Sequence, residues 1–380
     1  MTNTKEKRLW VNIILIVMLV LLMFSNIFSY SLEIFLHIRP NIPKSFETQV
    51  HFVDVGQGDA IAIKFSNGKT MLVDSGTKEY CHKLKYYLDN VVLQNSKTID
   101  YVVLTHPDVD HSGNMNYILE NYKVGTFYRP AVFEIYENCE PSCENYTYRQ
   151  LLKTLVSKDI CVKFNTSEYI TDGDVTIRML TTLDTANIGE LSSTNDYSPT
   201  IIIEDNDVRV LLAGDISEDI ERELILKYSE VLDVDILKLS HHGSKYSNTT
   251  EFLSITSPKI AVASCGVNTY GHPANETIKR ILDYDKANNT DLFDNYYSTL
   301  ESGNVVCTLK KDIQVDCVKN IDNYNFVDYW IYTLIFSVFI IWIIISPYIN
   351  VWKKNYRFKV QNKQFEKYLA SENQNRSAKS

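Results

Sequence analysis

The sequence predicts an α/β fold, a mixed pair of sheets covered by helices, with one membrane-spanning helix on each side of it. Short apolar segments of strand length alternate with helical segments between about residues 48 and 318. Turn signals such as Asn67-Gly68 join neighbouring strands into hairpins, which favours mixed sheets over a purely parallel one. Two long uncharged runs flank this region.

Each uncharged run is long enough to cross a bilayer. The runs Leu9 to Leu32 and Tyr329 to Trp352 contain 24 residues each, and roughly 20 apolar helical residues cover the hydrocarbon core. A cleaved signal peptide is the alternative for the first run, but no A-x-A site follows it. A buried core helix is the alternative for the second, whose aromatic residues and following Lys353-Lys354 favour a span.

Positive charges beside the runs predict how the chain is oriented. Lysine and arginine precede the first run and follow the second, so the positive-inside rule places both termini in the cytoplasm and the middle outside the cell membrane. The expected divisions are an N-terminal segment 1–8, a span 9–32, a linker 33–47, a folded domain 48–320, a span 327–352 and a tail 353–380.

The charge is divided unevenly along the chain. The net charge is −9, and the ends carry +2 (residues 1–30) and +5 (residues 327–380), which leaves −16 on residues 31–326. A strongly acidic middle argues against tight, broad binding of nucleic acid, because that affinity depends on Lys and Arg contacts to phosphates.

Within the middle, apolar segments rich in β-branched residues predict the strands in order. Strands are expected at 50–55, 60–65, 70–74, 101–105, 175–180, 200–204, 208–214, 235–240 and 259–264, and helices at 80–95, 218–228 and 274–285. Residues 131–195 are more polar and are expected to form a looser insertion.

Polar residues follow several of these strands directly. The densest group is T-H-P-D-V-D-H at 105–111, which offers His106, Asp108, Asp110 and His111. Imidazole and carboxylate groups are ligands of divalent metals. Solvated loop residues are the alternative, but four ligand-type residues in six positions favour a metal site. One loop cannot supply two metals, so the other ligands are expected after later strands, at Asp215, His241 and His242.

Six segments in the same order resemble a known family. T-H-P-D-V-D-H is similar to the H-x-H-x-D-H signature of the metallo-β-lactamase fold, and the set resembles the extracellular hydrolase domain of ComEC-type DNA-uptake proteins. The segments are H-F-V-D-V-G-Q-G-D-A (51–60), V-D-S-G (73–76), L-T-H-P-D-V-D-H-S-G-N (104–114), L-L-A-G-D (211–215), L-K-L-S-H-H-G-S-K (237–245) and N-T-Y-G-H-P (268–273).

This resemblance implies an αββα sandwich with two divalent metal ions, zinc or manganese, at one rim. One ion would be held by His106 and Asp108, and the other by Asp110, His111 and either His242 or His241, with Asp215 bridging. Asp74 would orient ligands, and Gly56, Gly58 and Asp59 would form a tight turn beneath the site. Where the wider fold has a further histidine, the chain has Asn195 and Asp196.

The implied activity is hydrolysis, by a metal-activated water, of a phosphodiester in a small phosphoester or a nucleic acid. Asp110 would take a proton from the water, and Lys245 and His272 would contact phosphate or protonate the leaving group. A solvated loop lysine and a turn histidine are the plain alternatives for those two. Hydrolysis of another bond, or a non-catalytic surface binding domain, are the alternative functions. The resemblance covers residues 48–318 and does not imply DNA import; protein partners stay unknown.

Overall fold

The computed structural model describes residues 45–94, 96–130, 146–165, 168–182, 193–318, 341–342 and 345–367. The chain divides into two units, one of Pro40–Asn320 and one of Met1–Arg39 with Ile321–Ser380. The sheets and the polar segments singled out in the sequence all belong to Pro40–Asn320, and the fold is described for that unit.

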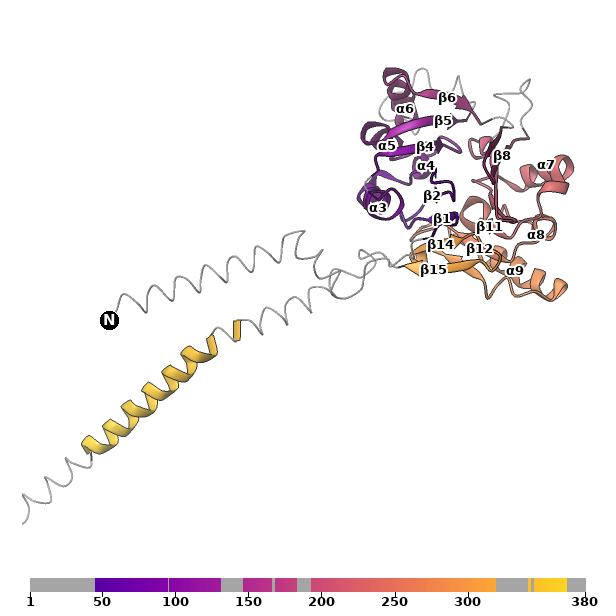
Figure 1. Cartoon of the computed structure of the whole chain (residues 1–380). Coiled ribbons are helices and arrows are strands. Elements are labelled where there is room, and N and C mark those ends of the chain that lie inside the picture. Colours follow the sequence, from indigo (N-terminus) through magenta and orange to yellow (C-terminus); the bar gives the residue numbers. More distant parts are fainter. Residues whose placement is uncertain are drawn as a thin grey trace, which may run out of the picture. The chain divides into compact units, whose positions relative to one another are not determined.

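Two mixed sheets form the centre of this unit (Figure 1). The strand order of the first sheet is β15 (Gln314–Val318), β14 (Asn304–Thr308), β1 (Gln49–Phe52), β2 (Ile61–Lys64), β3 (Thr70–Val73), β4 (Thr98–Val103), β5 (Lys123–Arg129) and β6 (Cys161–Phe164). The order of the second is β13 (Tyr296–Ser298), β12 (Ile260–Ala263), β11 (Ile236–Lys238), β10 (Val208–Leu212), β9 (Thr200–Asp205), β8 (Val175–Leu180) and β7 (Tyr169–Asp172).

Each sheet has a parallel half and an antiparallel half. Strands β3 to β6 pair in parallel, as do β10 to β13, whereas the other pairs are antiparallel. The mixed sheets agree with the prediction. Parallel neighbours matter for the site because their carboxyl ends lie at the same edge of a sheet.

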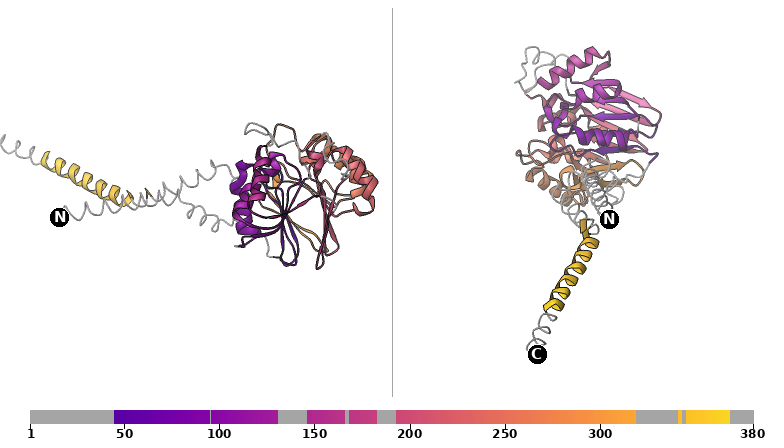
Figure 2. Two further views of the ribbon diagram at one scale, coloured as in Figure 1. Left: turned by 90° about the horizontal axis from the view of Figure 1, so that it is seen from above. Right: turned by 90° about the vertical axis from the view of Figure 1, so that its left-hand side faces the viewer.

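Helices cover the outer face of each sheet (Figure 2). The first sheet carries α3 (Cys81–Tyr87), α5 (Met115–Asn121) and α6 (Tyr146–Ser157), with α4 (Val109–Ser112) at its rim; the second carries α7 (Glu218–Tyr228), α8 (Thr250–Thr256) and α9 (Asn275–Asn288). A short helix, α10 (Thr299–Ser302), connects the two sheets between β13 and β14. The order of layers is αββα, as predicted.

The alternation of strand side chains produces three hydrophobic layers. In β3, Met71 and Val73 join the core between the sheets, while Leu72 joins the core beneath the helices of the first sheet. In β10, Val210 and Leu212 face the shared core, and Leu211 faces the helices of the second sheet. Because successive side chains point to opposite faces, a strand that is apolar throughout must be covered on both faces.

The region 131–195 differs from the expected loose insertion. Its described parts supply α6, β6, β7 and β8, and β8 pairs with β9 inside the second sheet. Helix α6 buries Tyr148, Leu151 and Leu155 in the core. The polar composition of this stretch reflects edge strands such as β6, whose side chains are exposed, and not a detached segment.

The first predicted span lies wholly outside the described residues, and the second lies outside them for the greater part. The run at 9–32 is not described, and of 327–352 the described residues are 341–342 and 345–352, which are helical. Within the described ranges, no helix combines the length and the apolar character that crossing a bilayer requires.

Candidate metal centre

Strand ends from both sheets bring ligand-type side chains together. Asp74 follows β3 and the 105–111 segment follows β4, while Asp215 follows β10 and His242 follows β11. These strands are parallel neighbours within their own sheets. The site therefore forms where the carboxyl edges of two packed sheets meet, which is why residues far apart in sequence converge there.

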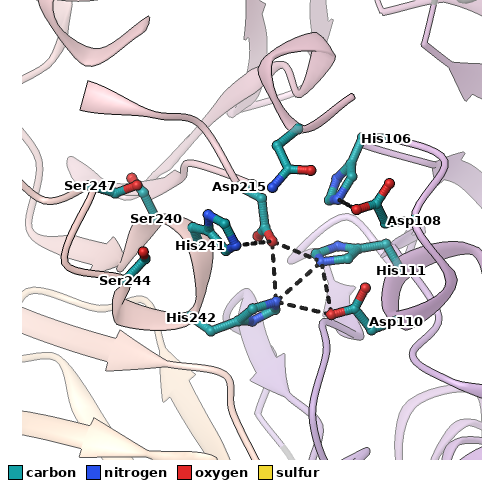
Figure 3. A network of polar contacts seen from close by, with 12 residues as sticks. His106, Asp108, Asp110, His111, Asp215, Ser240, His241, His242, Ser244 and Ser247 are labelled. Carbon is teal, nitrogen blue, oxygen red and sulfur yellow. Dashed lines mark hydrogen bonds and ion pairs between the residues drawn. The ribbon is translucent and has the colours of Figure 1, made fainter. Parts of the chain in front are cut away.

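Two buried histidines face one another at the centre of the site (Figure 3). The Nε2 atoms of His111 and His242 lie 3.4 Å apart. Asp215 Oδ2 lies 3.3 Å from Nε2 of His111 and 3.2 Å from Nε2 of His242. All three side chains are almost completely buried, so two ring nitrogens and one carboxylate oxygen share a small buried space.

The opposite nitrogen of each ring is already occupied. Nδ1 of His111 lies 2.7 Å from Asp74 Oδ2, and Nδ1 of His242 donates to the Ser264 carbonyl over 2.8 Å. A hydrogen bond at Nδ1 assigns the proton to that atom and leaves Nε2 as the free ligand atom. Both rings therefore present Nε2 to the centre.

Asp74 is held in place by its own neighbours. It adopts a left-handed backbone conformation with φ of 59° and is fully buried. Its carboxylate accepts hydrogen bonds from the backbone N–H and the hydroxyl of Thr105, over 2.8 and 2.7 Å. One carboxylate oxygen is thus aimed at Nδ1 of His111.

Asp110 lies at the solvent side of the two histidines. Its side chain is 30 % exposed, and its Oδ2 is 3.4 Å from Nε2 of His242 and 4.0 Å from Nε2 of His111. Burial alone would raise the pKa of Asp110, but His111 and His242 hold it well below its usual range. Asp110 is therefore an ionised carboxylate that both solvent and the histidines can reach.

His106 and Asp108 lie beside this centre. The rings of His106 and His111 are 4.0 Å apart between centroids, and Nε2 of His106 is 3.9 Å from Asp108 Oδ2. Nδ1 of His106 contacts the hydroxyls of Thr105 and Ser198, whereas its buried Nε2 has no hydrogen-bond partner among the described residues. Burial, reinforced by His111, lowers the pKa of His106 to about 4, so the ring is neutral at physiological pH.

Three further predicted residues are farther from the centre. His241 is 31 % exposed, and its Nε2 is 3.9 Å from Asp215 Oδ2. The His272 ring lies 5.2 Å from the His241 ring, and burial, together with His241, lowers the pKa of His272 to about 4. Lys245 is exposed, with its ammonium group 4.9 Å from the centre of the Tyr246 ring.

The choice between the two adjacent histidines depends on backbone conformation. His241 and His242 both have positive φ, 49° and 55°. These two left-handed residues direct the His242 ring inward and leave His241 at the rim. Sequence alone left this choice open, because both residues have the same chemistry.

Two residues of the centre were missed as site residues by sequence reasoning. Asp59, expected only as part of a turn, is buried, and its Oδ2 lies 2.5 Å from Nζ of Lys238, which is itself fully buried in β11. Asp59, His111, Asp215 and His242 each offer one ligand atom, and these four atoms lie within 4.8 Å of one another. The sequence contains a sign of this buried pair, because Lys238 is a charged residue within the apolar strand I-L-K-L, and Asp59 is a charged residue directly before the apolar strand A-I-A-I.

The turn before Asp59 has the tight geometry that its glycines predict. Gly58 has φ of +127°, and a Cβ placed there would lie 2.2 Å from the Asp110 carbonyl oxygen. The Asp59 N–H donates to that same oxygen over 3.2 Å. The turn is therefore packed directly under α4, and a side chain at Gly58 would displace Asp110.

These groups fit a divalent cation. Burial opposes protonation of His111 and His242, yet nearby carboxylates, Asp215 first, raise the pKa of both rings well above the usual value. Two imidazolium ions with Nε2 atoms 3.4 Å apart would repel each other. A cation that replaces both protons removes this conflict, and nitrogen and oxygen donors without sulfur suit zinc or manganese.

Residues 53–267 match the family described as the metallo-beta-lactamase superfamily. The chain belongs to the metallo-beta-lactamase superfamily. It is accordingly a metal-dependent hydrolase by family, and the superfamily fold binds divalent metals at the strand edge described above.

Two curated proteins are similar to this superfamily member, with about a quarter of the matched positions identical. ComE operon protein 3 of Bacillus subtilis is 25 % identical over 253 residues, which are 63 % of this chain and 31 % of that protein. Competence protein ComA of Neisseria gonorrhoeae is 26 % identical over 248 residues, 65 % of this chain and 31 % of that protein. The chain thus spans about a third of the length of these relatives.

One solved structure is similar to this chain at a low level. Igni18, a metallo hydrolase from Ignicoccus hospitalis, is 17 % identical and superimposes with a TM-score of 0.42, covering 69 % of this chain and 100 % of that one.

Proposed function

We propose that this protein is a membrane-anchored phosphodiesterase whose metal site faces outward from the cell. The observation that supports it best is the meeting of His111, His242 and Asp215 at one sheet edge, in a chain related to ComEC-type competence proteins. The substrate is a phosphodiester in a small phosphoester or in a nucleic acid.

The chain's own residues divide the work of hydrolysis among them. Divalent ions, when bound, activate water for attack and offset negative charge that develops on the phosphate. His111 and His242 hold an ion through Nε2, and Asp74 and the Ser264 carbonyl keep these two rings oriented. Asp215 would join this set through Oδ2, and His106 and Asp108 are the proposed ligands on the other side.

Asp110 is the proposed general base. It is ionised, partly exposed and within 3.4 Å of the His242 ring nitrogen, so its second oxygen is free to accept the proton of an attacking water. His272, neutral because its pKa is near 4, is suited to donate a hydrogen bond to a phosphate oxygen. Lys245 would add a mobile positive charge at the entrance.

The acidic character of the middle region favours small substrates over long duplexes. Residues 31–326 carry −16, and two divalent ions offset about four of these charges. Broad contact with a polyanion would then be repulsive outside the metal site. A short nucleotide or a single phosphodiester bond at the end of a strand can reach the ions without crossing that surface.

Activity is tested with the full-length protein in mild detergent, loaded with Mn²⁺ or Zn²⁺, on bis-(p-nitrophenyl) phosphate. A p-nitrophenyl acyl ester and a chromogenic β-lactam serve as matched substrates for other bonds. The proposal expects phosphodiester cleavage that Asp215→Asn abolishes and that chelation stops. Preference for an acyl bond would contradict it, and metal binding without any hydrolysis would favour a non-catalytic surface domain.

Orientation is tested by protease treatment of intact cells that express the chain with an epitope at its C-terminus. The proposal expects the folded domain to be cleaved while the epitope stays protected, because 353–380 lies in the cytoplasm. A domain that is cleaved only after lysis would contradict the outward orientation. A chain released from membranes by carbonate extraction would contradict the bilayer as a partner.

A further inference from the structure

A fully buried lysine lies on the far side of the metal centre from solvent. Lys238 has no exposed surface, and three oxygen atoms lie near its ammonium group: Asp59 Oδ2 at 2.5 Å, the Gly214 carbonyl, which accepts a hydrogen bond over 2.9 Å, and Asp215 Oδ1 at 3.5 Å. Asp215 Oδ1 makes an ion pair at that distance but no hydrogen bond with any described residue. Lys238 is therefore a buried cation whose nearest carboxylate is Asp59.

Asp59 faces the Nδ1 atoms of both histidines, whereas a metal bound between the two rings would be held by their Nε2 atoms. Its oxygens are closest to the Nδ1 atoms, 3.5 Å from Nδ1 of His242 and 3.9 Å from Nδ1 of His111. These Nδ1 atoms already contact the Ser264 carbonyl and Asp74. The Nε2 atoms point away from Asp59, toward each other and toward Asp215.

The two carboxylate oxygens of Asp215 face different groups. Oδ1 faces Lys238, whereas Oδ2 faces the two Nε2 atoms. If Asp59 did not neutralise Lys238, Asp215 would be the one described carboxylate left in an ion pair with that ammonium group, and a buried unpaired charge is strongly unfavourable. The position of Asp215 thus depends on Asp59 through Lys238.

We propose that Asp59 is the counter-ion of Lys238 and not a metal ligand, and that this buried pair holds Asp215 with one oxygen directed to the metal. Lys238 is then a positioning residue that leaves Asp215 free to bind a cation. The inference concerns metal binding alone and does not depend on which bond the protein hydrolyses.

The test uses Co²⁺ as the probe, because its visible absorption bands report the ligands directly bound to it. Full-length Asp59→Asn, Lys238→Met and the double variant D59N/K238M are compared with wild type for the Kd of Co²⁺ and for the spectrum at saturation. Asp59→Asn is expected to weaken binding about 10- to 100-fold, because Lys238 then draws Asp215 away. The double variant is expected to bind more tightly than Asp59→Asn and to give the wild-type spectrum.

The decisive result is the spectrum of the double variant. A change in its band positions and intensities, as expected from loss of a ligand, would overturn the proposal, as would a double variant that binds no better than Asp59→Asn. Asp215→Asn is the control that must alter the spectrum or abolish binding. Circular dichroism in EDTA checks folding; if either single variant is unfolded, the double variant, which lacks both charges, still decides the question. None of these measurements requires hydrolysis, so failure of the phosphodiesterase proposal would leave them interpretable.

Discussion

The Nε2 atoms of His111 and His242 face each other over 3.4 Å although 131 positions separate the two residues in the chain. Each histidine follows a strand of a different sheet, and each is oriented by a hydrogen bond at its other nitrogen. The metal centre is therefore a product of how the two sheets pack. Any change that shifts one sheet edge against the other should weaken metal binding before it unfolds the chain.

The two adjacent histidines should differ sharply in importance. Replacing His242 by Ala removes an inward Nε2 atom, so we expect the affinity for Mn²⁺ to fall by more than about 100-fold. His241→Ala is the matched control, because the side chain of His241 is 31 % exposed and its Nε2 lies 3.9 Å from Asp215. Isothermal titration calorimetry measures both. Equal losses in the two variants would contradict the inward assignment of His242.

Asp74 should act on the metal through His111. Asp74→Asn places an amide where the Nδ1 proton of His111 and the Thr105 donors require acceptors, so we expect metal affinity to fall about 10- to 100-fold with the fold retained. Asp100 is the matched control, because it accepts the same two kinds of hydrogen bond from Thr70 at the remote end of β3 and β4. If Asp100→Asn reduced affinity as much as Asp74→Asn, the effect would be one of general stability.

The turn at Gly58 should tolerate no side chain. Gly58→Ala adds a Cβ that would lie 2.2 Å from the Asp110 carbonyl oxygen at a positive φ, and we expect it to lower the free energy of unfolding by about 3 kcal/mol or more. Gly68→Ala is the control, since Gly68 also has positive φ but a Cβ there would meet open space, at a cost of about 1 kcal/mol. Urea unfolding compares the two, and equal losses would contradict the close packing under α4.

Buried His51 should make the domain less stable at mildly acidic pH. Burial, with a smaller contribution from Lys64, lowers the pKa of His51 to about 3 in the folded protein, whereas the unfolded chain binds a proton near 6.5. Between these values the unfolded state holds more protons, so the free energy of unfolding falls by up to about 1.4 kcal/mol for each pH unit below 6.5. Above 6.5 the contribution of this histidine to the pH dependence disappears.

The comparison that isolates this effect uses His51→Phe, which keeps an aromatic ring against Tyr87. Urea unfolding between pH 7.5 and 5 in EDTA gives the stability of both proteins without bound metal. Wild type should lose stability more steeply than the variant below pH 6.5. Parallel curves would show that His51 is protonated in the folded chain.

Helices and strands could be predicted from the sequence where a single local pattern, such as the charges at the ends of a helix or a run of apolar residues, determined them. Helix α7 begins and ends at the predicted residues, with Glu218 and Asp219 in its first turn and Lys227 in its last, which suits the helix dipole. Among the described strands, β1 to β4 and β8 to β12 were predicted because their sequences are largely apolar. The strand ends then indicated His111 and Asp215 correctly as neighbours.

The rest depended on tertiary packing that local patterns do not encode. The inward turn of His242 needs two consecutive left-handed residues, and neither is a glycine that would have signalled it. The partnership of Asp59 with Lys238 joins two sheets, so neither residue had a visible counter-ion in its own neighbourhood. In the 131–195 region, β6 pairs with β5, which lies outside that region, and the composition of β6 is that of an exposed edge strand.

The most direct test is the position of a manganese ion in crystals of the full-length protein, located by anomalous X-ray scattering. The account predicts an anomalous peak within bonding distance of Nε2 of His111, Nε2 of His242 and a single oxygen of Asp215. A peak on the Nδ1 side of these rings, next to Asp59, or saturating manganese without a peak at this edge of the sheets, would contradict it.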